Sequence, residues 1–353
     1  MVTKTIGSGG DYADMGLAWA DIVAFADDYT YTIISDFTEN NGVPAASPKQ
    51  YQGFTVTIEN PNGYVVTIPT DGSGGLKNWK FVALLQTATD KMVFDGIVFN
   101  LASINPANAF SFLTFSPGSQ YAYVSATYKN LKFIGSGYQA STAARNSACI
   151  GYDGAAGLQW TNAEIYNCIF YNFGTCFNGQ TIGASQTIKI ENCTSYDCYN
   201  GIFLATIPAG ASVLFKNMGI CECENSDFAT GISGAILTNC ADSDGTIATS
   251  GATYTNSQTG IVAADEYRSL DSASADFLKL NKGAISSTPT VLPTSGKKPI
   301  SVRFNNNTEY VVPSGVLYNS GTIPTLTNTD LAGNTYGQYG DYPIGCYNSE
   351  IDI

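Results

Sequence analysis

The chain contains no histidine, and this absence removes several kinds of catalytic and metal-binding site at once. Ser-His-Asp triads and Cys-His dyads need an imidazole that takes up and returns a proton. Zinc sites with His ligands are excluded for the same reason. A structural protein can lack histidine by chance, so the absence narrows the range of enzymes without indicating that the chain is one.

Positive charge is also scarce. Lys and Arg total 16 against 29 Asp and Glu, which leaves a net charge of −13. An acidic surface repels phosphate, so nucleic acid is not expected as a partner. Only 13% of residues are charged, whereas the chain has 36 Gly, 22 Tyr and 18 Phe. Few charges together with many glycines and aromatic residues are typical of short strands and turns rather than of helices.

Two further absences concern the setting in which the chain acts. No run approaches the ~20 apolar residues that a membrane span requires, so no membrane partner is expected. No basic and apolar leader with a cleavage site opens the sequence. We therefore expect synthesis in a host cytoplasm without a signal peptide, followed by release through lysis or a dedicated route.

Nine cysteines are present, so at least one has no partner within the chain. None stands in the C-x-x-C pairs of a structural zinc site. Cys168, Cys193 and Cys240 each follow an Asn at the same step of a repeating pattern. We interpret the cysteines as buried thiols that act as small apolar residues, in preference to disulfides or metal ligands. No metal and no cofactor is expected.

The pattern that orders the chain is an Asn that recurs at the end of a short alternating strand. The asparagines of this series are Asn130, Asn167, Asn192, Asn217 and Asn239. The last four are separated by 25, 25 and 22 residues, and the first precedes them by 37. Asp95 occupies the equivalent position one step before Asn130. The steps before Asn167 are longer than 25 residues because they contain Gly/Ser/Ala-rich loops. A fixed period of this size predicts stacked units that bury their apolar faces on one another.

Strand patterns separated by turns dominate the remaining chain, which predicts an all-β fold. Before the Asn series, strands are predicted at 2–6, 30–34, 54–59, 64–68, 79–85, 91–99 and 110–115. One amphipathic helix is predicted from Tyr12 to about Phe25, with Asp11 as its N-cap. Its position before the stacked units suits a helix that covers the open end of the core. A two-sheet sandwich is the rival architecture, but it does not predict the recurring Asn.

These patterns divide the chain into three parts. Residues 1–28 form the first strand and the capping helix, and residues 29–287 form the stacked coils. Residues 242–258 are predicted to be a loop near the end of that second part. Residues 288–353 form a Pro-containing linker, a small hairpin around 305–307 and a Gly- and Tyr-rich tail.

Several short motifs resemble those of one family, the pectin-lyase-like right-handed parallel β-helix proteins, including those found as bacteriophage virion surface proteins. The motifs are residues 5–13 before the helix, the Asn series, residues 276–280 with 283–285, and the tail segments 330–333 and 344–347. The tail departs from the pattern at Tyr336, where an Arg is usual, and at Cys346, where an Ala is usual. The resemblance implies a single right-handed parallel β-helix whose Asn series forms an internal ladder of side-chain hydrogen bonds.

Carboxylates are the remaining candidates for chemistry, because enzymes of such a fold cluster acids on one outer face of the coils. The candidates are Asp153, Glu164, Glu191, Asp197, Glu222, Glu224 and Asp227. Asp197 and Glu222 are one period apart, so they are expected to lie side by side and to shift each other's pKa. We favour the interpretation that these are solvated turn carboxylates, since no motif of a lyase, esterase or polygalacturonase accompanies them.

The expected function is therefore a non-enzymatic structural protein on the outer surface of a tailed-phage particle, as a capsid decoration, a vertex protein or a tail appendage. Other virion proteins are the expected partners, and the segments at each end would allow attachment, including as a homotrimer. Two alternatives stay open. One is a tailspike-type lyase or hydrolase that uses Asp197 and Glu222. The other is an adhesin that binds a host surface glycan without turnover.

Overall fold

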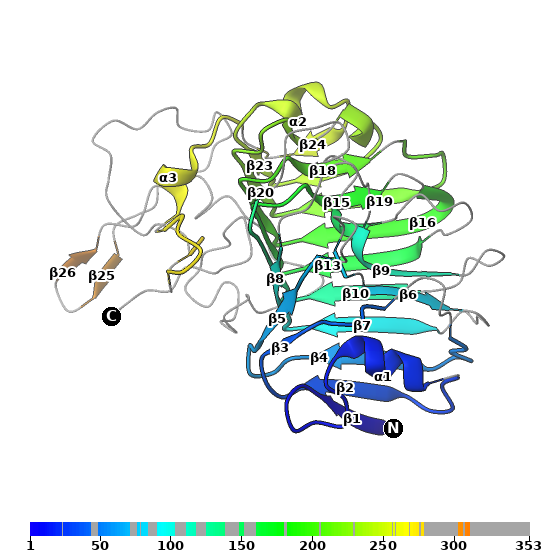
Figure 1. Cartoon of the computed structure of the whole chain (residues 1–353). Coiled ribbons are helices and arrows are strands. Elements are labelled where there is room, and N and C mark those ends of the chain that lie inside the picture. The colour runs from blue at the N-terminus through cyan, green and yellow to red at the C-terminus, as the bar shows by residue number, and fades with distance from the viewer. Residues whose placement is uncertain are drawn as a thin grey trace.

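The chain folds into three sheets in which every strand runs parallel to its neighbours, and a separate two-stranded hairpin. The computed structural model describes residues 1–278, 303–305 and 308–310, with gaps at 23, 44–48, 71–75, 78, 84–89, 103–110, 118–124, 138–147, 152–159, 180–181, 205, 229, 256, 258, 268 and 275–276. The predicted all-β class is confirmed for this part of the chain, and Figure 1 shows the strands stacked from β1 to β24.

Each sheet takes its strands in chain order. The first sheet contains β1 (Val2–Ile6), β2 (Tyr29–Ile33), β4 (Thr55–Glu59), β7 (Lys91–Asp95), β10 (Ser125–Lys129), β13 (Trp160–Tyr166), β16 (Ile182–Glu191), β19 (Ser212–Lys216), β22 (Ile236–Thr238) and β24 (Thr253–Thr255). The second contains β3 (Phe37–Thr38), β5 (Val65–Ile68), β8 (Val98–Leu101), β11 (Lys132–Gly135), β14 (Ile169–Tyr171), β17 (Thr194–Tyr196), β20 (Gly219–Cys221) and β23 (Ala241–Asp242). The third contains β6 (Trp79–Ala83), β9 (Ser111–Pro117), β12 (Ala148–Gly151), β15 (Thr175–Gly179), β18 (Asn200–Leu204) and β21 (Ser226–Phe228).

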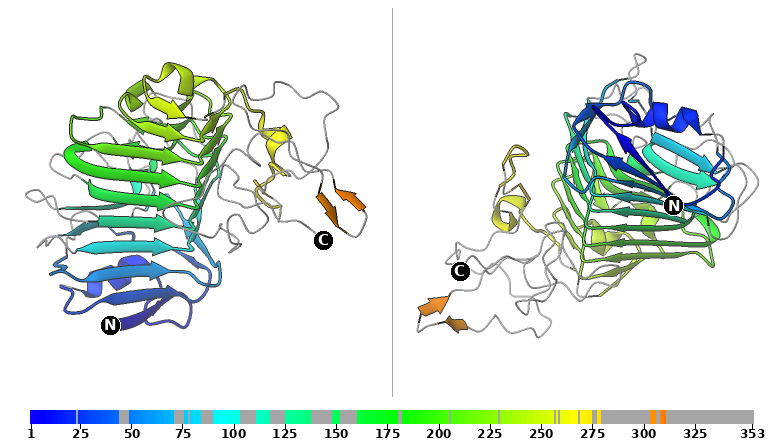
Figure 2. Two further views of the ribbon diagram at one scale, coloured as in Figure 1. Left: turned by 180° about the vertical axis from the view of Figure 1, so that it is seen from behind. Right: turned by 90° about the horizontal axis from the view of Figure 1, so that it is seen from below.

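From β4 to β21, each circuit of the chain adds one strand to each sheet. Thus β10, β11 and β12 form one circuit, and β13, β14 and β15 form the next. The register is kept between circuits, so Ile165, Ile190 and Phe215 form one column, as their equal phase in the sequence predicts. Seen along the stack, the three sheets surround a common interior (Figure 2, right). This arrangement is consistent with the parallel β-helix that the sequence suggests.

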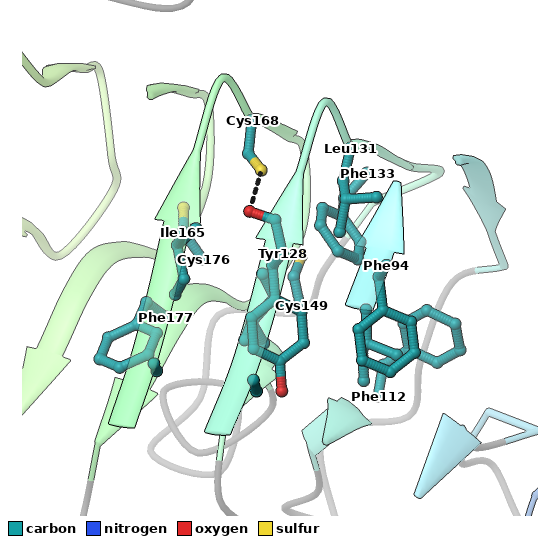
Figure 3. Packing of buried hydrophobic residues seen from close by; sticks show 14 of the residues in the cluster. Phe94, Phe112, Tyr128, Leu131, Phe133, Cys149, Ile165, Cys168, Cys176 and Phe177 are labelled. Carbon is teal, nitrogen blue, oxygen red and sulfur yellow. Dashed lines mark hydrogen bonds between the residues drawn. The ribbon is translucent and has the colours of Figure 1, made fainter. Parts of the chain in front are cut away.

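The interior is filled by columns of like side chains, because alternate residues of each strand point inward. Phe99, Phe133 and Phe170 stack in one column, with ring centroids 5.2 Å apart at both steps. Phe94 and Tyr128 stack in another, with centroids 5.1 Å apart and planes inclined by 9°. Figure 3 shows Phe94, Phe133 and Tyr128 within this buried cluster. Stacked rings bury large apolar areas, so these columns supply much of the stabilisation.

The first helix, α1, runs from Met15 to Asp21 and is shorter than the predicted helix. Its N-cap is Asp14, whose carboxylate accepts the N–H of Leu17 at 2.8 Å, and not Asp11. Residues before the helix lie against β1, since Tyr12 donates its N–H to the carbonyl of Thr5 at 3.1 Å. The backbone bonds of Tyr12 to β1 keep it out of the helix, which corrects the predicted N-terminus.

Two predicted boundaries are also wrong. The predicted strand 91–99 is divided into β7 and β8 by Gly96, which has φ of +71°. An added Cβ at Gly96 would lie 2.8 Å from the carbonyl oxygen of Asn60, so the corner needs glycine. The predicted loop 242–258 contains the end of β23, the helix α2 (Thr246–Thr249) and β24. Thr253 donates its N–H to the carbonyl of Ala235 at 2.9 Å, which adds one more strand to the first sheet. A short 3₁₀ helix, η2, spans Thr230–Ile232.

After β24 the chain packs against the outer face of the second sheet. This segment, residues 261–278, contains α3 (Ala263–Glu266) and is called the C-terminal strap below. A second apolar cluster joins the strap to the sheet, and it contains Ile169, Cys221, Ala241, Ile261, Ala263, Tyr267, Phe277 and Leu278. The ring of Phe277 meets that of Tyr171 edge-on, with centroids 5.0 Å apart. The strap therefore covers apolar groups that face away from the core.

Beyond the strap, the structure describes residues 303–305 and 308–310. The hairpin predicted around 305–307 is present as β25 (Arg303–Asn305) paired antiparallel with β26 (Thr308–Tyr310). The linker at 288–299, the tail segments and Cys346 lie outside the described residues. Only Phe277 and Leu278 of the predicted closing coil at 276–280 are described. The proposed division at residues 28 and 287 stays a prediction.

Candidate functional site

Five asparagines occupy one corner of the stack, where the chain passes from the first sheet to the second. They are Asn130, Asn167, Asn192, Asn217 and Asn239. Each has a left-handed backbone, with φ between 51° and 57°. Each donates its N–H to the carbonyl of the residue before the equivalent corner on the next circuit, at 2.9 to 3.2 Å. Asn adopts this conformation more readily than other non-glycine residues, which explains the recurring residue type.

The side chains at this corner form two runs of hydrogen bonds. In the first, Nδ2 of Asn130 donates to Oδ1 of Asp95 at 2.7 Å, and Nδ2 of Asn167 donates to Oδ1 of Asn130 at 3.2 Å. In the second, Nδ2 of Asn217 donates to Oδ1 of Asn192 at 2.9 Å. The Nδ2 of Asn192 is buried without a partner. The corner is thus a ladder in its backbone and a partial ladder in its side chains.

Replacing Asn192 by alanine is expected to cost about 1–3 kcal/mol of unfolding free energy. The change removes the acceptor of the Asn217 amide and leaves a Cβ-bearing residue in the left-handed conformation. Asn192→Gly keeps that conformation without strain, so it should cost less than Asn192→Ala. Urea unfolding followed by tryptophan fluorescence would measure both variants.

Asn239 provides the matched control for this substitution. It has the same backbone conformation, but both of its amide atoms are buried without a hydrogen-bond partner. Asn239→Ala therefore loses the conformational preference and no side-chain hydrogen bond. A cost as large as that of Asn192→Ala would contradict a contribution from the side-chain ladder.

A second corner series lies where the chain leaves the second sheet. Asn172, Asp197 and Glu222 have φ of 51°, 53° and 56° and are one period apart. Asn172 and Asp197 donate their N–H groups to carbonyls on the next circuit, each at 3.2 Å. The candidate acid pair predicted from the sequence, Asp197 and Glu222, therefore continues a series of left-handed corner residues. We call these two carboxylates and their backbone the acid corner.

Aromatic side chains flank the acid corner. Tyr171 and Tyr196 stack with ring centroids 5.8 Å apart and planes inclined by 6°. Burial, together with the charges of Glu222 and Asp197, raises the pKa of Tyr196 to about 12. Partial burial and the charges of Glu222 and Glu224 raise the pKa of Asp197 above its ordinary value.

The two residues of the acid corner have the composition of an acid–base pair, and Asp197 also has a structural role at the corner. A half-buried carboxyl group with a raised pKa beside an exposed carboxylate is the arrangement that general acid–base catalysis uses. Left-handed corners in a coil select Asn, Asp or Gly for backbone reasons, and Asp197 fits that preference. Glu222 does not, because glutamate is a poor left-handed residue. Its presence is the feature here that the fold does not require.

Replacing Glu222 by asparagine is expected to stabilise the chain by about 0.5–1 kcal/mol, because asparagine suits the left-handed corner and relieves repulsion from Asp197. The control is Glu224→Asn, an exposed glutamate without a positive φ, which should change stability by less than about 0.5 kcal/mol. Urea midpoints at neutral pH compare the two variants. A clear loss of stability in Glu222→Asn would show that the contacts of the Glu222 side chain outweigh the backbone strain.

The remaining acids predicted as site candidates are dispersed. Glu164 lies on the outer face and forms an ion pair with Lys189, with Oε1 and Nζ 3.5 Å apart. Glu191 was expected to point into solvent, but it is only 4% exposed because it lies between the side chains of adjacent circuits. Asp227 is buried, and its carboxylate accepts the N–H and hydroxyl of Ser243 at 2.6 and 2.8 Å. Asp153 lies outside the described residues.

One buried carboxylate with a clear role was not predicted from the sequence. Glu39 accepts the N–H of Met15 at 3.1 Å, that of Gly42 at 2.9 Å and the indole N–H of Trp79 at 2.8 Å. It thereby attaches the start of α1 to the coils, and burial raises its pKa. The repeating sequence pattern does not identify Glu39, because its hydrogen-bond partners come from one helix, one loop and one strand.

Asp242 is a second buried carboxylate that the sequence did not single out. Its Oδ2 accepts the N–H of Ile247 at 2.6 Å, whereas its Oδ1 has no hydrogen-bond partner. Burial raises its pKa to about 6, with the charges of Asp244 and Asp227 acting in the same direction and the Ile247 hydrogen bond opposing them. A carboxylate in this position is destabilised in its charged form.

Stability should therefore depend on pH through Asp242. The folded chain binds this proton more tightly than the unfolded chain, so its contribution is greatest below about pH 4 and is lost as pH rises through about 6. Asp242→Asn should raise the melting temperature at about pH 7, with the gain shrinking toward about pH 4. Thermal melts at several pH values would test this, and a gain independent of pH would contradict the assignment.

In the described part of the chain, no group of three or more Cys, Asp or Glu side chains is arranged to hold a metal ion. Among the same residues, no helix is long and apolar enough to cross a membrane. No protein-family model, curated protein or solved structure matches this chain. The stacked parallel sheets and their corners are accordingly the observations on which a functional proposal depends.

Proposed function

We propose that this chain is a non-enzymatic structural protein on the outer surface of a virus particle, as a capsid decoration, a vertex protein or a tail appendage of a tailed phage. The supporting observation is that Asp197, one of the two candidate acids, belongs to a series of left-handed corner residues whose N–H groups bond the next circuit. A stack of parallel circuits hydrogen-bonded at every step makes a stiff rod, which suits a surface component.

The proposal includes finer features of the architecture. The coils are right-handed, as in pectin-lyase-like proteins, and α1 acts as the cap of the first circuit. Burial of Met15, Ala18 and Trp19 in the core supports that role for α1. The segments at the two ends attach the chain to neighbouring virion proteins or to two further copies in a homotrimer. Analytical ultracentrifugation of the full chain would distinguish a monomer from a trimer.

Mass spectrometry of purified particles tests the proposal directly. The chain should be present in particles after extensive washing, in a fixed ratio to a capsid or tail protein. Antibodies to the chain should label the particle surface in electron micrographs. Absence from purified particles, with the chain found only in the soluble lysate, would exclude a virion role.

A polysaccharide-degrading enzyme of the tailspike type is the second candidate, and the raised pKa of Asp197 beside Glu222 and Tyr196 favours it. Release of reducing ends from capsular or pectic polysaccharides would reveal such an activity. Asp197→Asn and Glu222→Gln should then abolish it, whereas Glu164→Gln, in an ion pair on the first sheet, should not. Retention on a glycan array without turnover would instead indicate an adhesin for a host surface glycan.

A further inference from the structure

The second sheet has an outer face that is apolar and buried. Phe170 of β14 and Ile220 of β20 belong to the interior cluster. Their neighbours Ile169 and Cys221 therefore point outward, because successive side chains of a strand point to opposite faces. Both are nevertheless 0% exposed. Outward-facing side chains of a coil reach solvent unless another part of the chain covers them, so this face of the sheet is covered.

The C-terminal strap supplies apolar side chains to this face. Four buried side chains of the strap belong to the same cluster as Ile169 and Cys221, and they are Ile261, Tyr267, Phe277 and Leu278. This outer cluster shares no residue with the interior cluster. The strap can therefore leave the sheet without opening the interior of the coils.

The hydrogen bonds of the strap differ from those of the coils. Ile261 donates its N–H to the carbonyl of Asp242 on β23 at 3.1 Å, which fixes the first residue of the strap to the sheet. At the other end, Leu278 donates its N–H to the carbonyl of Ser269 at 2.9 Å, within the strap itself. A segment that bonds to itself and contacts the sheet through side chains can separate as one unit, at lower cost than a strand of the stack.

The connection between β24 and the strap permits such a movement. Gly260, directly before the strap, has φ of +74°, and nothing lies within 4 Å of an added Cβ. Thr259 and Gly260 are both exposed. A glycine in open space can change its backbone angles without a clash, so the strap can turn away from the sheet at this point.

One described thiol lies on the face that the strap contacts, and the others face the interior. Cys221 belongs to the outer cluster. Figure 3 shows two of the interior thiols, Cys168 and Cys176, among buried side chains of the core. The full interior set is Cys149, Cys168, Cys176, Cys193, Cys198, Cys223 and Cys240. Opening of the strap would therefore expose Cys221 while these seven thiols stay buried.

We propose that the C-terminal strap is a detachable cover, which opens as one unit about Gly260 while the coils stay folded. Opening uncovers the outer face of the second sheet at Ile169 and Cys221. It also frees the edge of Tyr171, whose ring centroid is 5.0 Å from that of Phe277. Tyr171 belongs to the stacked tyrosine pair beside the acid corner, so the closed strap covers one side of that pair.

Native-state alkylation of the full chain tests the proposal. Reduced protein is exposed to iodoacetamide without denaturant, samples are quenched over time, and labelled peptides are quantified by mass spectrometry. We expect Cys221 to be labelled before the seven interior thiols, which should react only as fast as the whole chain unfolds. Each thiol is read from its own peptide, so labelling of Cys346 does not interfere. Amide hydrogens of the strap should exchange together, ahead of those of β20.

Two variants of the strap separate opening of the cover from unfolding of the coils. Phe277→Ala should speed the labelling of Cys221 by about tenfold or more, because truncating the ring weakens the contacts that hold the strap closed. Val262→Ala is the matched control, since Val262 lies in the same strap but is 51% exposed, and it should leave the rate unchanged. Labelling of Cys193 should be equal in all three proteins.

Labelling of Cys221 at the same rate as Cys193 in the unmodified chain would overturn the proposal, because the strap would then open only when the coils unfold. Complete labelling of Cys221 within the mixing time would also overturn it, since the strap would not be closed in solution. So would a Phe277→Ala variant that speeds both thiols equally or neither. Exchange of the strap amides one by one would contradict opening as a unit.

Discussion

Phe133→Ala is expected to lower the free energy of unfolding by about 3–5 kcal/mol, the range found when a buried phenylalanine is truncated in a rigid core. Phe133 is fully buried at the centre of the column, with Phe99 and Phe170 stacked on its two faces and Phe112 at its edge. The neighbouring circuits are held by backbone hydrogen bonds, so they cannot close around the cavity. The substitution loses both the buried ring and the stacking contacts.

Phe133→Leu is the matched control, since it keeps most of the buried volume and should cost about 1–1.5 kcal/mol. Urea unfolding can be followed by the fluorescence of Trp79, whose ring centroid is 5.2 Å from that of Phe99. Equal costs for the two variants would mean that the stacked geometry contributes nothing beyond apolar area. A cost below about 1 kcal/mol for Phe133→Ala would argue against a rigid column.

Gly135→Ala is expected to destabilise the chain by about 3 kcal/mol, the upper end of the usual cost of overpacking. A Cβ at this position would clash with the carbonyl oxygen of Asn172 and would lie 2.8 Å from its carbonyl carbon and 3.1 Å from the carbonyl oxygen of Tyr171. The obstacle is backbone of the next circuit, at the second corner series. Relief requires separating two circuits that the whole stack holds in register.

The control for Gly135 is Gly63, a turn glycine with φ of +70° and nothing within 4 Å of an added Cβ. Gly63→Ala should cost only about 1 kcal/mol, from the left-handed backbone. Thermal and urea unfolding of the two variants side by side separates crowding between circuits from local strain. If Gly135→Ala were no worse than Gly63→Ala, the close approach of the two circuits would be in doubt.

The two corner series bear differently on function. The first is made of asparagines and is accounted for by backbone conformation and hydrogen bonds between circuits. The second begins the same way at Asn172 but continues as Asp197 and Glu222, which are flanked by stacked tyrosines. A fold of this kind serves unrelated functions, so any chemistry must be argued from such a local departure. The stability of Glu222→Asn and the activity of Glu222→Gln therefore both test whether Glu222 serves a function rather than the fold.

That the chain is made of stacked circuits could be predicted from the spacing of its residues. A residue needed at a corner recurs once per circuit, so the spacing of the asparagines from Asn167 onward equals the number of residues in one circuit. Columns of like residues follow from the same register, and so does the burial of Cys168, Cys193 and Cys240, which share one position in the period. These features were predictable because they depend on spacing along the chain alone.

Which side chains meet across a corner or between sheets could not be predicted in this way and is visible only in the folded chain. The hydrogen bonds of Glu39 to the start of α1 and the packing of the strap on Tyr171 join residues whose separations are not multiples of the circuit. The division of β7 from β8 at Gly96 depended on the carbonyl of Asn60 in a neighbouring circuit. Side-chain direction at a turn is set by local backbone angles and by neighbouring circuits, and neither leaves a periodic trace in the sequence.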